Sequence, residues 1–142
     1  PEVLYNKKYS KASDVYSFGI IAYEIVSGIP AYNNITHDIK LQRNVYNGSR
    51  PSIPEHVPKL VAELIIKCWD DQPNKRPTSK EIYDIISIWN NDMSDDSSEI
   101  AAQIRKADEI LGLNMSTLSH FNIYAEEIYD NRRFKPLNAI NL

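Results

Sequence analysis

The stretch Ser13-Asp14-Val15-Tyr16-Ser17-Phe18-Gly19 decides the fold, because it opens the strongest helical signal in this chain of 142 residues. Either Ser13 or Asp14 can cap the start of a helix, since both side chains accept hydrogen bonds from free amides. The run that follows is apolar on nearly every face, which is typical of a helix in a protein interior. Gly28 is a suitable C-terminal cap, and a proline two residues later prevents continuation. The sequence therefore predicts a buried helix over 13–27.

Three further helices are expected after this one, with irregular connectors between them. The first is capped by Thr36 and runs to Tyr46. The second begins at Pro58, a residue suited to a first helical turn, and runs to about residue 69. The third opens at Thr78 with a Thr-x-x-Glu capping box and carries isoleucines on one side. No convincing strand is visible, so the sequence predicts a mainly α fold.

The composition is that of an ordinary globular protein, with 42% hydrophobic and 25% charged residues. The net charge of -3 argues against a broad nucleic-acid or membrane footprint, so neither partner is expected. Cys68 is the only cysteine, which excludes an internal disulfide and fits a reducing, intracellular and cytoplasmic setting. Because it lies in an apolar run, we interpret it as a small buried hydrophobe rather than a reactive thiol.

Four motifs, taken in order, resemble the lower half of a eukaryotic protein kinase catalytic domain. They match the end of the family's Ala-Pro-Glu triplet, its Asp-x-Tyr/Trp-Ser-x-Gly signature, a Gly-x-x-Pro-aromatic turn and a Cys-Trp…Arg-Pro stretch. The last of these is common in tyrosine-kinase and tyrosine-kinase-like members. In this chain the four are Pro1-Glu2, residues 13–19, residues 28–32, and Cys68-Trp69 with Arg76-Pro77. The resemblance implies the C-terminal part of the large helical lobe over residues 1–90.

The resemblance also implies five structural motif residues. Glu2 and Arg76 should form a buried ion pair, in which a carboxylate and a guanidinium meet in a bidentate fork. The alternative is that both are surface charges. Asp14 either caps its helix or, as in the family, holds the catalytic loop through backbone hydrogen bonds. Gly19 belongs to the same signature, and Trp69 is most simply a core aromatic.

The motifs that bind ATP and transfer phosphate are not found in this sequence. Kinases use a Gly-rich loop, a His-Arg-Asp catalytic loop and a metal-binding Asp-Phe-Gly. None of the three occurs here, and the histidines show no metal-ligand spacing with Cys68. We therefore expect no catalytic, cofactor-binding or metal-binding residue in this chain. ATP and magnesium are expected only for the complete kinase domain.

The first residue is proline rather than methionine, so we expect a fragment, a processed product or an incomplete gene model. Its partners would then be the missing N-lobe and catalytic loop, in the same or a longer chain. Such a kinase would phosphorylate protein serine or threonine, or tyrosine. The alternative is a truncated, non-catalytic kinase lobe that acts as an interaction module, because a missing upper lobe would expose apolar area.

The rest of the chain gives weaker signals. Residues 91–99 are polar and acidic and are interpreted as a linker. Residues 100–142 form a weakly helical extension, with a second short helix expected over 119–129. This extension either acts as a separate docking tail or packs back on the lobe, and it faintly resembles tails of expanded fungal kinase families. The helix at 36–47 is either a docking face, as in many kinases, or a plain solvated surface.

Overall fold

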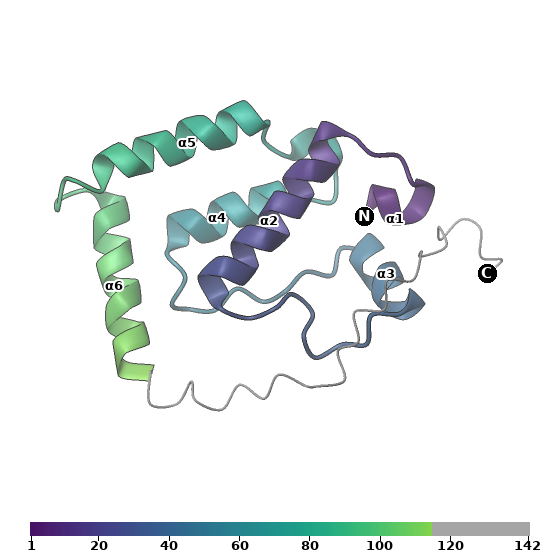
Figure 1. Ribbon diagram of the computed structural model, residues 1–142, viewed down its shortest axis with the longest axis horizontal. Helices are drawn as coiled ribbons and strands as arrows, with labels where there is room; N and C mark the ends of the chain where they lie inside the picture. Colours follow the sequence, from purple (N-terminus) through teal and green to yellow (C-terminus); the bar gives the residue numbers. More distant parts are fainter. Residues whose placement is uncertain (115–142) are drawn as a thin grey trace.

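The computed structural model describes residues 1–114, and within this part of the chain every regular element is helical (Figure 1). The mainly α fold predicted from the sequence is therefore confirmed for these residues. In chain order the elements are α1 (Glu2–Asn6), α2 (Lys11–Ser27), α3 (Ile39–Tyr46), α4 (Lys59–Cys68), the 3₁₀ turn η1 (Pro73–Lys75), α5 (Ser79–Asp92) and α6 (Glu99–Asn114).

The centre of the fold is the crossing of α2 and α4, with α5 and α6 on one side and α1 and α3 on the other (Figure 1). Cys68 is fully buried at this crossing, and Ile65, on the same helix, is almost so. Gly19 allows the close approach, because a Cβ at this position would lie 2.8 Å from the Cβ of Cys68. Real Cβ contacts are essentially never that short, so only glycine fits here without a shift of one helix.

Two helices are capped by other side chains than those that the sequence assigned. Ser10, rather than Ser13 or Asp14, caps α2: its hydroxyl accepts from the amide of Ser13, whose own hydroxyl accepts from the amide of Ser10. Asp38, rather than Thr36, caps α3 by accepting from two amides of its first turn. In both cases neighbouring Ser, Thr and Asp residues have the same capping chemistry, so sequence alone did not select between them.

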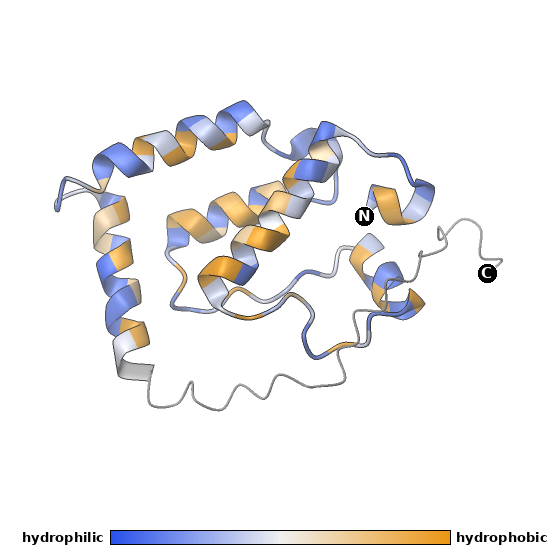
Figure 2. Ribbon diagram, viewed as in Figure 1, coloured by the Kyte–Doolittle hydropathy of each residue, from blue (hydrophilic) through white to orange (hydrophobic). Residues whose placement is uncertain are grey.

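The expectation that α2 is buried on all sides is wrong. One stripe of this helix is open to solvent, with Phe18 37%, Ile21 56% and Ile25 75% exposed. These positions follow the helical repeat, so they form one apolar face, while Val15 and Tyr23 face the core. In Figure 2 the later turns of α2 are largely coloured as hydrophobic, whereas its first turns are hydrophilic or neutral. No helix in the described part of the chain is long and apolar enough to cross a membrane.

The first part of the C-terminal extension packs back on the lobe. Helix α6 contacts both α4 and α5, and it buries Ile100, Ala101 and Ala107. The side-chain oxygen of Gln103 accepts a hydrogen bond from the amide of Leu60 at 2.9 Å, in the first turn of α4. Helix α4 has no side-chain cap of its own, so this contact replaces one. The short helix expected over 119–129 lies outside the described residues.

The close contact at the α2–α4 crossing predicts a specific cost for Gly19→Ala. The added methyl must displace one of the two helices, so the free energy of unfolding should fall by about 1–3 kcal/mol. Urea denaturation monitored by circular dichroism measures this change.

The matched control is Gly112→Ala in α6, where an added Cβ meets nothing within 4 Å. Alanine is the better helix former, so this variant should be neutral or more stable by up to about 1 kcal/mol. Equal unfolding free energies for the two variants would contradict the packing described for Gly19.

Candidate functional site

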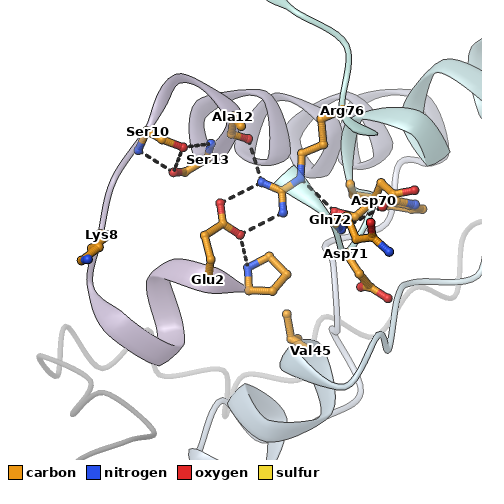
Figure 3. Close-up of polar contacts among 12 residues, drawn as sticks. Glu2, Lys8, Ser10, Ala12, Ser13, Val45, Asp70, Asp71, Gln72 and Arg76 are labelled. Atoms are coloured by element: carbon orange, nitrogen blue, oxygen red, sulfur yellow. Dashed lines mark hydrogen bonds and ion pairs between the residues drawn. The ribbon is translucent and has the colours of Figure 1, made fainter. Parts of the chain in front are cut away.

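Arg76 lies between η1 and α5 and connects three segments of the chain (Figure 3). Its Nε donates to the carbonyl of Asp70 at 2.8 Å, and its Nη1 donates to the carbonyl of Ala12 at 2.8 Å. Both terminal nitrogens donate to the Glu2 carboxylate, each at 2.9 Å. The side chain of Arg76 is fully buried. One guanidinium thus joins α1, the first turn of α2 and the loop that follows α4.

Glu2 and Arg76 form the bidentate ion pair that the resemblance implied, and not two separate surface charges. The Glu2 side chain is 21% exposed, so the pair is buried mainly on the arginine side. Burial alone would raise the pKa of Glu2, but hydrogen bonds from Arg76 and the nearby positive charges lower this pKa to about 2. The carboxylate is therefore ionised throughout the ordinary pH range, and the ion pair with Arg76 is present over the same range.

Tyr16, from the motif in α2, brings a second arginine into the same site. The guanidinium carbons of Arg76 and Arg50 each lie 5.1 Å from the centre of the Tyr16 ring. At this distance the electron-rich ring face attracts a cation. Burial raises the pKa of the Tyr16 phenol, so the ring stays neutral beside the two arginines. The Tyr16 ring thus packs with both guanidinium groups.

Arg50 is a structural centre that the sequence did not reveal. Its Nε donates to the carbonyl of Trp69 at 2.8 Å, and its Nη1 donates to the carbonyl of Val45, in the last turn of α3, at 3.0 Å. The other terminal nitrogen pairs with the Asp71 carboxylate. Arg50 therefore fixes α3 to the loop after α4. Only its position, as a lone cation in a connector, distinguished it in the sequence.

The remaining motif residues lie around this network. Gly19 is at the α2–α4 crossing described above, and Trp69 is a buried core aromatic whose ring lies 5.8 Å from that of Tyr23. Asp14 is in the first turn of α2 and is exposed. Its amide donates to the carbonyl of Ser10 at 3.3 Å, whereas its carboxylate has no hydrogen bond or ion pair with another described residue. Its carboxylate is favoured there by the helix dipole, although Ser10 makes the cap.

The contacts of this site anchor segments of the described chain to one another. Cys68 is fully buried, and burial raises the pKa of its thiol to about 11, so little thiolate forms near neutral pH. Among the described residues there is no group of three or more His, Cys, Asp or Glu placed to hold a metal ion. Chemically, Arg76 neutralises the Glu2 carboxylate through the bidentate fork. Together with Arg50 and the Tyr16 ring, it holds the connected segments of the chain in position.

A helical lobe in which an Ala-Pro-Glu-type glutamate pairs with a distant arginine is the arrangement that the resemblance to a protein kinase domain implied. The family profile of protein tyrosine and serine/threonine kinases matches residues 1–86. The chain therefore belongs to the protein tyrosine and serine/threonine kinase family. Helix α6 lies beyond the matched region.

Individual relatives agree with this membership. A probable serine/threonine-protein kinase of Dictyostelium discoideum is 38% identical over 70% of the chain, and a probable LIM domain-containing serine/threonine-protein kinase of the same organism is 40% identical over 61%. The human tyrosine-protein kinase Fer is 37% identical over 62%. The matched regions span only 6%, 9% and 11% of these three proteins. None of the three is fungal, so the likeness of the C-terminal extension to fungal kinases stays a prediction.

The fork geometry predicts that lysine does not replace Arg76. Arg76→Lys keeps the charge but loses the paired donors to Glu2 and the contacts to two carbonyls, so the free energy of unfolding should fall by about 1.5–3 kcal/mol. Urea denaturation measures the change. Lys75→Arg, at the exposed neighbouring position, is the control and should stay within about 0.5 kcal/mol. Similar small effects for both variants would show that the fork does not stabilise the fold.

The lowered pKa of Glu2 predicts a pH dependence. Since the folded pKa of about 2 lies below the ordinary value of 4.5, the unfolded state binds the proton more readily. Stability from the pair is therefore fully present above about pH 4.5 and is lost as the pH falls toward 2. The stability difference between the wild type and Glu2→Gln should narrow from pH 6 to pH 2.5. Glu109→Gln, on exposed α6, is the control variant, and a Glu2→Gln difference that stays constant would contradict the assignment.

Proposed function

We propose that this chain is the C-terminal part of the helical lobe of a kinase that transfers the γ-phosphate of ATP to a protein serine or threonine. In this proposal ATP, magnesium and the catalytic loop belong to other parts of the same protein. The chain supplies the support on which those parts are placed. The single observation that carries the proposal is the Arg76 fork, which fixes Glu2 beside the core helices in a chain of the kinase family.

The exposed apolar stripe of α2 supports the assignment of catalysis to other parts of the same protein. The stripe of Phe18, Ile21 and Ile25 is more apolar than a solvated surface requires, and exposed apolar patches mark surfaces that other protein covers. Asp14 lies one turn from this stripe and presents its carboxylate without a partner among the described residues. In the proposal, the rest of the catalytic domain packs on the stripe, and Asp14 accepts hydrogen bonds from its catalytic loop.

Serine and threonine are the favoured acceptors, with tyrosine as the alternative. The Cys68-Trp69 stretch resembles the tyrosine-kinase-like group, and two of the relatives described above carry serine/threonine-protein kinase in their names. The similarity to the human tyrosine-protein kinase Fer favours the alternative. In the proposal, the described lobe supplies the Glu2–Arg76 anchor, and the residues that select an acceptor belong to other parts of the same protein.

A non-catalytic kinase lobe is the second candidate function, and it is favoured by one specific observation. The apolar stripe on α2 is exposed in the chain as it stands, which would suit a lobe that binds a separate partner protein. In that case the motif residues stabilise the fold and serve no reaction. The two candidates predict native proteins of different mass and activity, so recovery of the native protein can distinguish between them.

The proposal predicts that the 142-residue chain alone does not bind nucleotide. Millimolar ATP with magnesium should shift its melting temperature by less than about 1 °C, because a ligand that does not bind cannot stabilise the folded state. Differential scanning fluorimetry measures the shift, with ADP as the comparison. A clear ATP-induced rise would show a nucleotide site in this lobe and would contradict the assignment of ATP to other parts of the protein.

The native protein completes the test. An antibody raised against residues 90–110 should recover a species much larger than 16.3 kDa that transfers labelled phosphate to a protein substrate. Phosphoamino-acid analysis of the product then decides between serine or threonine and tyrosine. Recovery of an inactive species near 16.3 kDa would instead favour the non-catalytic lobe.

A further inference from the structure

A groove lies between helix α4 and the connector that leads from α3 to the start of α4 (Figure 1). Its volume is about 460 Å³, within the range of roughly 300–1,000 Å³ that is usual for small-molecule sites. We refer to it as the α4 groove. Among the described residues, those that line it come only from the connector, from α4 and from the residue that follows α4.

One stripe of α4 forms the first wall of the α4 groove. Lys59, Ala62 and Ile66 line the groove and are three or four residues apart, so they lie on the same face of the helix. Trp69, at the C-terminal cap of α4, ends this wall. Ile66 is 53% exposed, whereas the neighbouring Ile65 is 1% exposed and lies in the core. The groove therefore has an aliphatic side chain that the protein leaves largely uncovered.

The opposite wall is the connector, which is apolar and held in place. Two contacts fix it to the core: the Tyr23 hydroxyl donates to the carbonyl of Ser52 at 3.4 Å, and Arg50 Nε donates to the carbonyl of Trp69 at 2.8 Å. A site that keeps its shape before binding loses less conformational entropy when a ligand binds. The apolar residues of this wall are Pro51, Ile53, Pro54 and Val57.

Three charged side chains line the α4 groove, and two of them are already neutralised. The guanidinium of Arg50 pairs with Asp71, and its other donors bind backbone carbonyls. The ammonium of Lys59 lies 3.8 Å from the Glu63 carboxylate.

The third charge, on Glu55, is free. Glu55 is exposed, and its carboxylate has no hydrogen bond or ion pair with another described residue. The unpaired charge of the groove is therefore negative, and a ligand of complementary charge carries a cation. An anionic ligand would meet a carboxylate without a counter-ion and two cations that already have partners.

We propose that the α4 groove binds a hydrophobic amine, which is a ligand with an aliphatic or aromatic body and one ammonium group. The body lies between Ile66 and the apolar wall of the connector, where it removes apolar surface from water. The ammonium pairs with Glu55. Neither ATP nor phosphoryl transfer takes part, so the inference goes beyond the proposed function and holds for either candidate.

The test uses the 142-residue chain and three ligands that share an octyl body and differ in the head group: octylammonium, octanoate and 1-octanol. An NMR titration of the backbone amides, below the concentrations at which the ligands aggregate, measures affinity and locates the site. Octylammonium should shift the amides of Ile53, Val57 and Ile66, and it should bind about threefold more tightly than 1-octanol. Octanoate should bind more weakly than 1-octanol. Absence of shifts in the groove, or octanoate binding as tightly as octylammonium, would overturn the proposal.

A matched pair of variants tests the charge. Glu55→Gln should abolish the preference for octylammonium over 1-octanol and leave the affinity for 1-octanol within about 1.5-fold, because an exposed ion pair contributes only to the charged ligand. Glu109→Gln, at an exposed position on α6, makes the same change in net charge and should keep the preference. An equal loss of preference in both variants would mean attraction by overall charge alone and would overturn the proposal.

A second pair tests the apolar body. Ile66→Ser should weaken all three ligands about threefold, because it removes apolar contact surface from the groove. Ile88→Ser on α5, at a 57% exposed position, should leave their binding unchanged. Circular dichroism checks that each variant is folded. Shifts centred on the exposed stripe of α2 instead of the groove would mean general binding to apolar surface and would also overturn the proposal.

Discussion

The rest of the structure depends on the placement of one buried guanidinium. Arg76 is separated from Glu2 by 74 residues, yet it binds both oxygens of that carboxylate and two backbone carbonyls. A buried arginine without such partners would be strongly destabilising, so the segments that supply them are held together as a set. Helix α1, with only five residues, is too short to be stable by itself and relies on this contact.

The anchoring extends through aromatic and cationic side chains to α3 and to the loop that follows α4. Tyr16 lies beneath the guanidinium groups of both Arg76 and Arg50, and Arg50 continues the network to α3 and to the carbonyl of Trp69. The motif in α2 thus serves several purposes. Gly19 allows the close approach of α4, the Tyr16 ring packs with the two arginines, and Asp14 is exposed to solvent. The residues of one short motif thus position several helices of the described lobe.

Much of this arrangement could be predicted from the sequence, and the failures have physical causes. Helix α2 and the capping box at Thr78 follow from local rules, and the structure contains both. The Glu2–Arg76 pair was predictable only from motif order, because no local rule joins residues so far apart. Arg50 was missed because its main partners are carbonyls and an aromatic ring, which leave no charge pattern. The exposed stripe of α2 was missed because an apolar helix does not reveal what covers it.

A double-mutant cycle between Glu2 and Arg76 tests the central claim most directly. Glu2→Gln, Arg76→Gln and the double variant would be compared with the wild type by urea unfolding at neutral pH. Since the two residues share a bidentate contact, the account predicts a coupling free energy of at least about 1.5 kcal/mol. Additive effects, within about 0.5 kcal/mol, would contradict the account, because Glu2 and Arg76 would then stabilise the fold independently of each other.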